Sequence, residues 1–180
     1  MAVRLRRRRA AGCEAWKGVR AGNAAWLAPW ESGDPEHGGG ITFRRWVQRQ
    51  RRDETEGTGV VLLIEFQMRI VGQISLGGIV YGAMRTGVVG YWVSQDATGR
   101  GIAPMAVAML ADWELHDQAG PHLHRLEIAV MPHNERSLRV VAKLGAHREG
   151  LRAGYMYVHG GWRDHLTFSL LADDAPEGFA

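Results

Sequence analysis

The 180-residue chain contains a single cysteine, Cys13, so it cannot form an internal disulfide bond. No metal-ligand pattern surrounds Cys13, so we expect no metal site, and a reducing cytoplasm is the expected location. Long apolar runs are also missing. The most apolar stretch, 60–64 (VVLLI), suits a buried strand and is far too short to span a bilayer. The arginines near the start are followed by no apolar segment, so we expect neither a signal peptide nor a membrane partner.

Charge of one sign is not in large excess, since the formal net charge is +3. The arginines are nevertheless concentrated in two places, 6–9 and the cluster of Arg44, Arg45, Arg49, Arg51 and Arg52. Such clusters attract phosphate-rich partners, although they more often form the solvated face of a strand or helix. Direct binding of nucleic acid or of a ribonucleoprotein surface is therefore kept as an alternative and is not favoured.

Hydrophobic periodicity, with breaks at glycine and proline, predicts seven strands and four helices. The expected strands are 3–6, 60–66, 70–76, 88–93, 123–130, 150–158 and 164–171, and the expected helices are 12–26, 41–54, 101–118 and 135–144. A loop rich in proline and glycine is expected at 27–40. No repeat or linker interrupts this series, so residues 1–171 are predicted to form one domain and 172–180 a disordered tail.

The most informative stretch is 90–113, which is typical of a strand, a glycine-containing turn and a helix. Gly99 and Gly101 stand where the helix begins, and the first backbone N–H groups of a helix have no intrahelical partner. Because glycine has no side chain, a pyrophosphate could rest directly on these amides. The pattern lacks the lysine of a P-loop and the third glycine of a dinucleotide fingerprint. By itself it is equally compatible with a tight loop of no chemical role.

A second segment, 134–145 (NERSLRVVAKLG), makes the assignment more specific. Together with 98–103 (TGRGIA), it resembles the GNAT superfamily of N-acetyltransferases, whose acetyl-CoA loop reads (Q/R)xxGx(G/A). The segments 148–152 (REGLR) and 161–165 (GWRDH) resemble one branch of that superfamily, the RimJ/RimL-type ribosomal-protein-alanine N-acetyltransferases. The resemblance extends from about Val3 to Leu171. It departs at Asp96, where Gln or Arg is preferred, at Ala146, where an aromatic residue is usual, and at Val141, where many relatives carry a tyrosine acid.

The resemblance implies an α+β fold, a single domain with a central mixed, mostly antiparallel sheet flanked by helices. It also implies acetyl-CoA as cofactor and direct attack of an amine on the thioester in a ternary complex. The cofactor-binding positions it implies are Val93, through its backbone amide, Thr98, Gly99, Arg100, Gly101, Ile102, Ala103, Asn134 and Ser137.

Two residues are predicted to be catalytic. Ser137 has a hydroxyl to donate to the departing thiolate, and Glu127 matches an acidic position that some relatives use as the base. The alternatives are structural: Asn134 and Ser137 cap a helix, and Glu127 pairs with Arg125 or another cation. His133 and His165 are poorer candidates and are expected to be structural.

The acceptor groove of this fold usually lies between the loop after the first helix and the last hairpin. The substrate-binding residues predicted there are Trp30, Trp92, Tyr155, Trp162 and Asp164. The first hypothesis is acetylation of a protein N-terminus, such as that of a ribosomal protein, on chains that begin with alanine or serine. The alternatives are acetylation of a small amine, such as an antibiotic or polyamine, and a catalytically silent GNAT-like module that binds RNA or a ribosomal particle. Either a monomer or a homodimer is compatible with the sequence.

Overall fold

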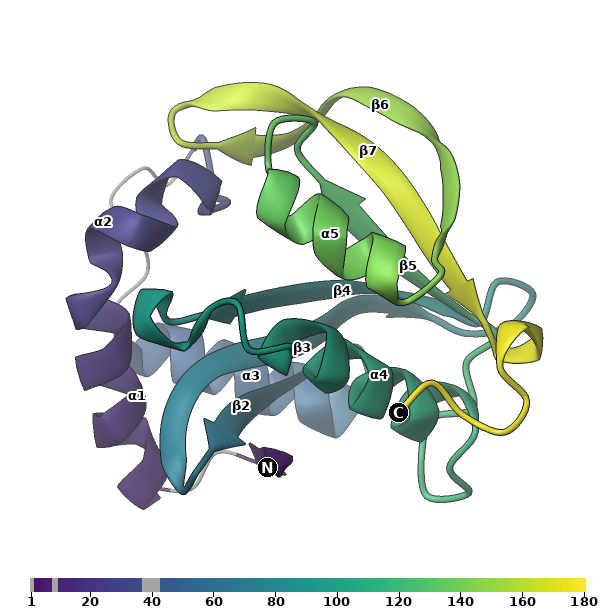
Figure 1. Cartoon of the computed structure of the whole chain (residues 1–180), viewed down its shortest axis with the longest axis horizontal. Coiled ribbons are helices and arrows are strands. Elements are labelled where there is room, and N and C mark those ends of the chain that lie inside the picture. The colour runs from purple at the N-terminus through teal and green to yellow at the C-terminus, as the bar shows by residue number, and fades with distance from the viewer. Residues whose placement is uncertain (1, 8–9, 37–42) are drawn as a thin grey trace.

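A seven-stranded sheet runs through the computed structural model, which describes residues 2–7, 10–36 and 43–180 (Figure 1). The strand order is β1-β2-β3-β4-β5-β7-β6, and every neighbouring pair is antiparallel except β4 and β5. This confirms the predicted α+β fold with a mixed, mostly antiparallel sheet. The strands are β1 (Val3–Arg7), β2 (Val60–Phe66), β3 (Arg69–Val80), β4 (Thr86–Val93), β5 (Arg125–Val130), β6 (His147–Val158) and β7 (Gly161–Leu171).

Helices cover both faces of the sheet. They are α1 (Ala10–Gly22), α2 (Ala24–Leu27), α3 (Phe43–Glu56), α4 (Ile102–Leu115) and α5 (Glu135–Lys143). Figure 1 shows α3 behind the sheet and α4 in front of it. On the rear face, the ring of Trp16 in α1 stacks on Trp46 of α3 at 4.8 Å and lies 6.5 Å from Trp92 of β4. Indole packing therefore joins both rear helices to the sheet.

The core lies between the sheet and α4. Ala106, Val107, Leu110 and Ala111 of this helix are fully enclosed, because the helix carries apolar residues around most of its circumference. They belong to one continuous cluster with side chains of four central strands, including Ile64, Ile74, Leu76, Val89, Leu126 and Ile128. Burial of these aliphatic groups fixes α4, and hence the turn that precedes it, against β4.

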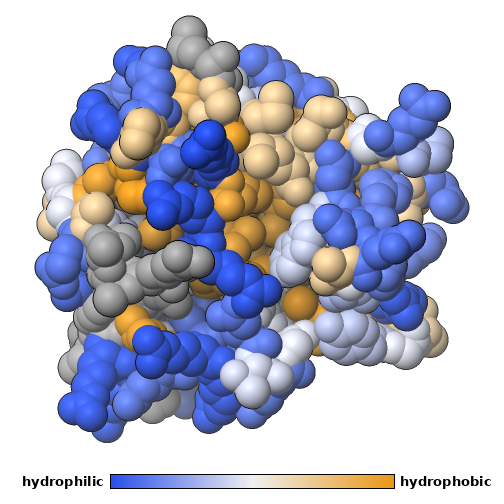
Figure 2. Space-filling view, turned by 90° about the horizontal axis from the view of Figure 1, so that it is seen from below, coloured by the Kyte–Doolittle hydropathy of each residue, from blue (hydrophilic) through white to orange (hydrophobic). Residues whose placement is uncertain are grey.

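The face seen from below in Figure 2 has a central hollow with apolar side chains, surrounded by hydrophilic ones. A shallow groove between β1, the β2–β3 turn and α4 is lined by Leu5, Met68 and Met109, with Arg4, Arg6 and Glu65 beside them. Because β1 is an edge strand, its outer backbone groups are open to pairing with another chain. The three arginines of β1, Arg4, Arg6 and Arg7, are charged side chains of the kind that discourage such pairing.

Strands β4 and β5 separate partway along their length. They pair in parallel from Thr86 and Arg125 as far as Val89 and Ile128, and no pairing extends beyond that point. The remaining part of β4, up to Val93, therefore borders an opening in the sheet. Side chains alternate along a strand, so Tyr91 and Val93 face α4 and α5, whereas Trp92 faces α1. Glu127 lies level with Val88 and shares the face of Trp92.

The predicted helix at 12–26 is in fact two helices, α1 and α2, divided at Asn23. The side chain of Asn23 donates to the carbonyl of Val19 at 2.8 Å and accepts from the backbone amide of Gln95 at 2.8 Å. It therefore ends α1 and ties that end to the turn after β4. Residues Ala28–Trp30 form a 3-10 turn inside the predicted loop. The predictions for Arg8, Arg9 and 37–42 lie outside the described residues.

Residues 172–180 follow β7, and the disorder expected for them stays a prediction. Ala172–Asp174 form a 3-10 turn. Farther on, the backbone amides of Phe179 and Ala180 donate to the Asp112 carboxylate at 2.5 and 3.0 Å, and the Phe179 ring lies 6.2 Å from His116. The Asp112 carboxylate of α4 thus holds the last residues, and their composition alone does not indicate this contact. In the part of the chain described, no helix is both long and apolar enough to cross a membrane.

Candidate active site at the opening between β4 and β5

The turn before α4 has the backbone geometry of an anion site. Gly99 and Gly101 adopt φ values of 76° and 74°, in the left-handed region that side chains disfavour. A Cβ added at either position would meet no atom within 4 Å, so the space above the turn is open. Gly101 is the N-cap of α4 and makes no side-chain capping hydrogen bond. The amides of Ile102 and Ala103 therefore remain available to a phosphate, whereas Pro104 has no N–H to offer.

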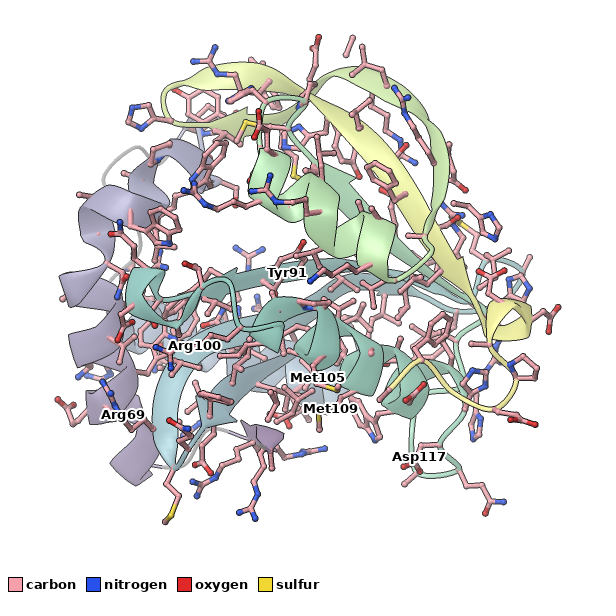
Figure 3. All side chains as sticks on the ribbon, in the orientation of Figure 1. Arg69, Tyr91, Arg100, Met105, Met109 and Asp117 are labelled. Carbon is pink, nitrogen blue, oxygen red and sulfur yellow. The ribbon has the colours of Figure 1, made fainter. Side chains whose placement is uncertain are left out.

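Charged side chains surround this turn. Asp96 lies 4.0 Å from Arg69, and the guanidinium of Arg100 donates to the Asp96 carbonyl oxygen at 3.3 Å. Figure 3 shows Arg69 and Arg100 on the same side of the molecule, close to the turn. The Ser94 hydroxyl, and to a smaller extent Arg69, hold the pKa of Asp96 below its usual value. Asp96 is therefore ionised at neutral pH and opposes the attraction of the two arginines for an anion.

The N-terminus of α5 presents Ser137 to Tyr91. The side-chain oxygen of Asn134 caps the helix by accepting from the Ser137 amide at 3.2 Å, which is the capping role considered for Asn134. The Ser137 hydroxyl lies 2.6 Å from the phenol oxygen of Tyr91. Burial raises the pKa of Tyr91 to about 12, so this phenol keeps its proton at neutral pH.

Val93 ends β4 with its backbone amide directed at the opening. The next residue, Ser94, donates to the carbonyl of Val71 at 2.7 Å. Because hydrogen-bonded and non-hydrogen-bonded pairs alternate in an antiparallel ladder, the N–H of Val93 points away from β3 and toward β5. Its carbonyl oxygen accepts a hydrogen bond from the indole of Trp26 at 3.2 Å. The Val93 amide is therefore placed to act as a donor inside the opening.

Glu127 is engaged by several donors at once. Its two carboxylate oxygens accept from the guanidinium of Arg152 at 2.6 and 2.7 Å and from the Tyr155 hydroxyl at 2.8 Å. Arg125 lies 3.4 Å away and also makes a two-pronged ion pair with Glu149. The Glu127 side chain is only 9% exposed. The geometry thus matches the ion-pair alternative, because both carboxylate oxygens already accept hydrogen bonds from neighbouring side chains.

The residues predicted to bind substrate do not form a single cluster. The Trp30 ring lies 5.4 Å from His133, and Trp162 is largely exposed on the β6–β7 turn, in edge contact with Tyr157. Trp92 packs inward, with Arg20 5.7 Å from its ring, rather than along an open groove. Asp164 accepts from the Gly154 amide at 2.7 Å, so at least one oxygen supports the irregular part of the hairpin.

The segment after α2 is joined to the last hairpin. The amide of Gly33 donates to the carbonyl of Tyr157 at 2.9 Å, and Ser32 forms a β-bridge with Val158. Figure 1 shows α2 and the β6–β7 turn side by side at one end of the molecule. This backbone connection joins the segment after α2 to the end of β6.

Sequence reasoning missed three residues of the site: Tyr91, Trp26 as a partner of Val93, and Arg152. The hydrogen-bond partner of each lies far away in the sequence. Ser137 is 46 positions from Tyr91, Val93 is 67 positions from Trp26, and Glu127 is 25 positions from Arg152. For Tyr91 and Trp26 the only signal in the sequence was the aromatic content of β4 and α2, which fits packing equally well. Arg152 lies in the segment 148–152 that resembles the RimJ/RimL branch, but that resemblance gives no partner for it.

Comparison with known proteins agrees with this geometry. The model of the acetyltransferase (GNAT) domain family matches residues 12–147. A probable N-acetyltransferase of Bacillus subtilis, YjcK, is 34% identical over 129 residues, which cover 72% of this chain and 68% of YjcK. The [ribosomal protein uS5]-alanine N-acetyltransferase of Escherichia coli is 30% identical over 112 residues, which cover 62% of this chain and 56% of that enzyme.

The solved structure of Mycobacterium smegmatis RimJ in complex with CoA-disulfide matches with a TM-score of 0.87 at 33% identity, covering 98% of this chain and 85% of RimJ. The open glycine turn, with its free amides, fits the pyrophosphate of CoA. The expected family, fold and cofactor are therefore confirmed. The chain belongs to the GNAT family, in its RimJ-type branch, and is an acetyl-CoA-dependent N-acetyltransferase.

Proposed function

We propose that this acetyltransferase modifies the N-terminal α-amino group of a protein, with ribosomal proteins as the favoured class. In the reaction, the amine nitrogen bonds to the acetyl carbon as the carbon–sulfur bond breaks. The nitrogen loses one proton, and the sulfur leaves as a thiolate that is then protonated. The named activity of the Escherichia coli relative, which acts on an alanine of ribosomal protein uS5, supports this substrate class.

The state of Glu127 carries the proposal. Its carboxylate is shared by Arg152, Arg125 and Tyr155, so it is not free to take a proton from the amine. An α-amino group with a pKa near 8 is about one quarter neutral at pH 7.5, whereas a lysine with a pKa near 10.4 is neutral in only about one molecule in a thousand. A site without a strong base at Glu127 therefore favours an α-amine over a lysine or a polyamine.

The chain supplies two groups for the developing charges. The Val93 amide, directed into the opening between β4 and β5, donates to the carbonyl oxygen as it gains negative charge. The Ser137 hydroxyl, at the start of α5, donates to the departing sulfur. Both donors sit on regular elements, β4 and α5, so little reorganisation is needed during the reaction.

The turn before α4 would hold acetyl-CoA, which supplies the activated acetyl group as a thioester. The contacts we propose are from the backbone amides of the turn and first helical positions, and from Asn134 near the opening. The residues proposed for the cofactor are Val93, Thr98, Gly99, Arg100, Gly101, Ile102, Ala103, Asn134 and Ser137. The side chain of Ile102 is buried in the core, so this residue can contribute only its N–H.

On the acceptor side, the bridge between Ser32 and Val158 frames an entrance that suits an extended N-terminus. We propose Trp30, Tyr155 and Trp162 as its aromatic contacts. Tyr155 is fixed by its hydrogen bond to Glu127, and burial together with this bond raises the pKa of Tyr155. It therefore stays a neutral phenol and does not attract a cationic group by charge. Trp92 and Asp164 are weaker proposals, because the first packs inward and the second supports Gly154.

The test compares two peptides of equal length in a CoA-release assay, with the products identified by mass spectrometry. One has a free alanine N-terminus and no lysine, and the other has a blocked N-terminus and one internal lysine. Acetylation of the first alone supports the proposal. Acetylation of the lysine peptide at a comparable rate contradicts it, and so does acetylation of spermidine when neither peptide reacts.

A further inference from the structure

Tyr91 makes a contact that the proposed function does not yet use. It lies on β4, two residues before Val93, and its side chain crosses to α5, where its phenol oxygen is 2.6 Å from Ser137 Oγ. The ring packs against the apolar core and is labelled in Figure 3 beside α5. A buried phenol needs a hydrogen-bond partner, and here the partner is the hydroxyl proposed to serve the departing sulfur.

The direction of this hydrogen bond follows from acidity. Either oxygen can donate in this contact; because a phenol is a far stronger acid than an aliphatic alcohol and is therefore the better donor, we assign the donor role to Tyr91 and the acceptor role to Ser137 Oγ. The hydroxyl proton of Ser137 is then not consumed by Tyr91 and can point elsewhere. The backbone of Ser137 is fixed at the same time, because its amide is held by Asn134 at 3.2 Å. Two contacts thus orient one hydroxyl.

We propose that Tyr91 is a positioning residue that fixes the Ser137 hydroxyl as a hydrogen-bond donor to the sulfur of CoA. This inference rests on the proposed role of Ser137. No net proton leaves Tyr91, because its hydrogen bond only sets the rotation of the Ser137 hydroxyl. On α5 itself, Val141 is buried in the core and has no hydroxyl, so the phenol near Ser137 comes from the strand.

The test measures the pKa of the CoA thiol bound to the enzyme, by thiolate absorbance across pH, and requires no acceptor. A donor at the sulfur stabilises the thiolate and lowers this pKa. We expect Tyr91→Phe to raise it by roughly 0.4 to 1 unit, corresponding to one hydrogen bond. Ser137→Ala should raise it at least as much. Tyr81→Phe is the matched control, because its hydroxyl bonds to the Gly57 carbonyl outside the opening, and it should leave the thiol pKa unchanged.

The double variant separates positioning from general packing. If Tyr91 acts through Ser137, the thiol pKa of Tyr91→Phe/Ser137→Ala equals that of Ser137→Ala alone. The proposal is overturned if Tyr91→Phe leaves the thiol pKa at the wild-type value, if its effect adds fully to that of Ser137→Ala, or if Ser137→Ala has no effect. These results do not depend on which amine is acetylated, so the proposed acceptor can fail in the peptide assay while this inference stands.

Discussion

The indole nitrogen of Trp26 donates a hydrogen bond to the carbonyl oxygen of Val93 at 3.2 Å. This contact joins α2, on the acceptor side, to the end of β4, where the Val93 amide faces the opening. The guanidinium of Arg136 lies 4.5 Å from the same indole, so α5 is part of the arrangement. The Trp26 side chain thus links α2, on the acceptor side, both to the Val93 amide, which we propose as the oxyanion donor, and to α5, which carries Ser137.

Trp26→Phe should lower kcat/KM about 3- to 10-fold, because it removes the donor to Val93 but keeps a ring for Arg136. Steady-state kinetics with the alanine peptide, together with calorimetry of CoA binding, measure the effect. CoA affinity should change little, since the pyrophosphate turn is untouched. Trp113→Phe, on α4, is the control for loss of an indole. Equal losses in both variants would show that the contact with Val93 has no special part in catalysis.

Glu127→Gln distinguishes an ion pair from a catalytic base. We expect a loss of roughly 1–3 kcal/mol in the free energy of unfolding, because Arg152 loses a charged partner whose own side chain is only 9% exposed. The fall in kcat/KM should stay below about tenfold, with the acidic limb of the pH–rate profile, where a catalytic base would gain its proton, unchanged. Glu149→Gln, which removes the other carboxylate of Arg125, is the comparison. A loss of a hundredfold or more in kcat/KM with full stability would restore Glu127 as the base.

Asp96→Asn should tighten CoA binding about 2- to 4-fold at low salt. The pKa of Asp96 is lowered, so its negative charge is present throughout pH 6–8 and repels the pyrophosphate. The gain in CoA affinity is modest because the Asp96 side chain is 69% exposed. Isothermal titration at two salt concentrations measures it, and the difference should shrink at high salt. Asp117, which is labelled in Figure 3, lies on the loop after α4, and Asp117→Asn should leave the CoA affinity unchanged. Weaker binding in Asp96→Asn would mean that the carboxylate organises the turn instead.

Glu114 makes the stability of the fold depend on pH. Its side chain is fully buried, neither carboxylate oxygen has a hydrogen-bond partner within the described residues, and burial raises its pKa from 4.5 to about 8. The folded state therefore holds a proton that the unfolded state has lost. As far as Glu114 is concerned, the free energy of unfolding is highest below pH 4.5 and falls as the pH rises toward about 8.

Glu114→Gln removes this dependence. Thermal unfolding should give similar Tm values for the variant and the wild type near pH 4.5, and a higher Tm for the variant at pH 8, by an amount corresponding to a few kcal/mol. Glu135→Gln, exposed at the start of α5, controls for loss of one carboxylate. Parallel Tm curves for wild type and Glu114→Gln across this range would contradict a buried, protonated Glu114.

The strands and the long helices could be predicted from the sequence because their signals are local. The alternation in β1, the apolar run of β2 and the cap of α5 at Asn134 each lie within a few residues of the element they define. The break at Asn23 was not predictable, since it depends on a hydrogen bond to Gln95, 72 residues away. The contact of the last residues with Asp112 of α4 was not predictable for the same reason, because its partners lie 67 positions apart.

The residues of the site likewise fall into those that the sequence could identify and those that it could not. Gly99, Gly101, Asn134 and Ser137 could be found because a family motif records them in order. The role of Glu127 could not be decided, because its environment is made by Arg152 and Tyr155 of another strand. Tyr91 was not identified, because a tyrosine in a strand is ordinarily a packing residue. Only the fold brings its hydroxyl close to Ser137.

The most direct test of the account maps the acetylated atom on natural substrates. Unacetylated ribosomal proteins are incubated with the enzyme and acetyl-CoA, and the modified site is located by tandem mass spectrometry, with Ser137→Ala as the control for non-enzymatic acetylation. The account predicts acetylation of an N-terminal α-amino group, much slower in the variant, with the lysines left unmodified. Acetylation confined to lysine side chains, at equal rates in both enzymes, would contradict it.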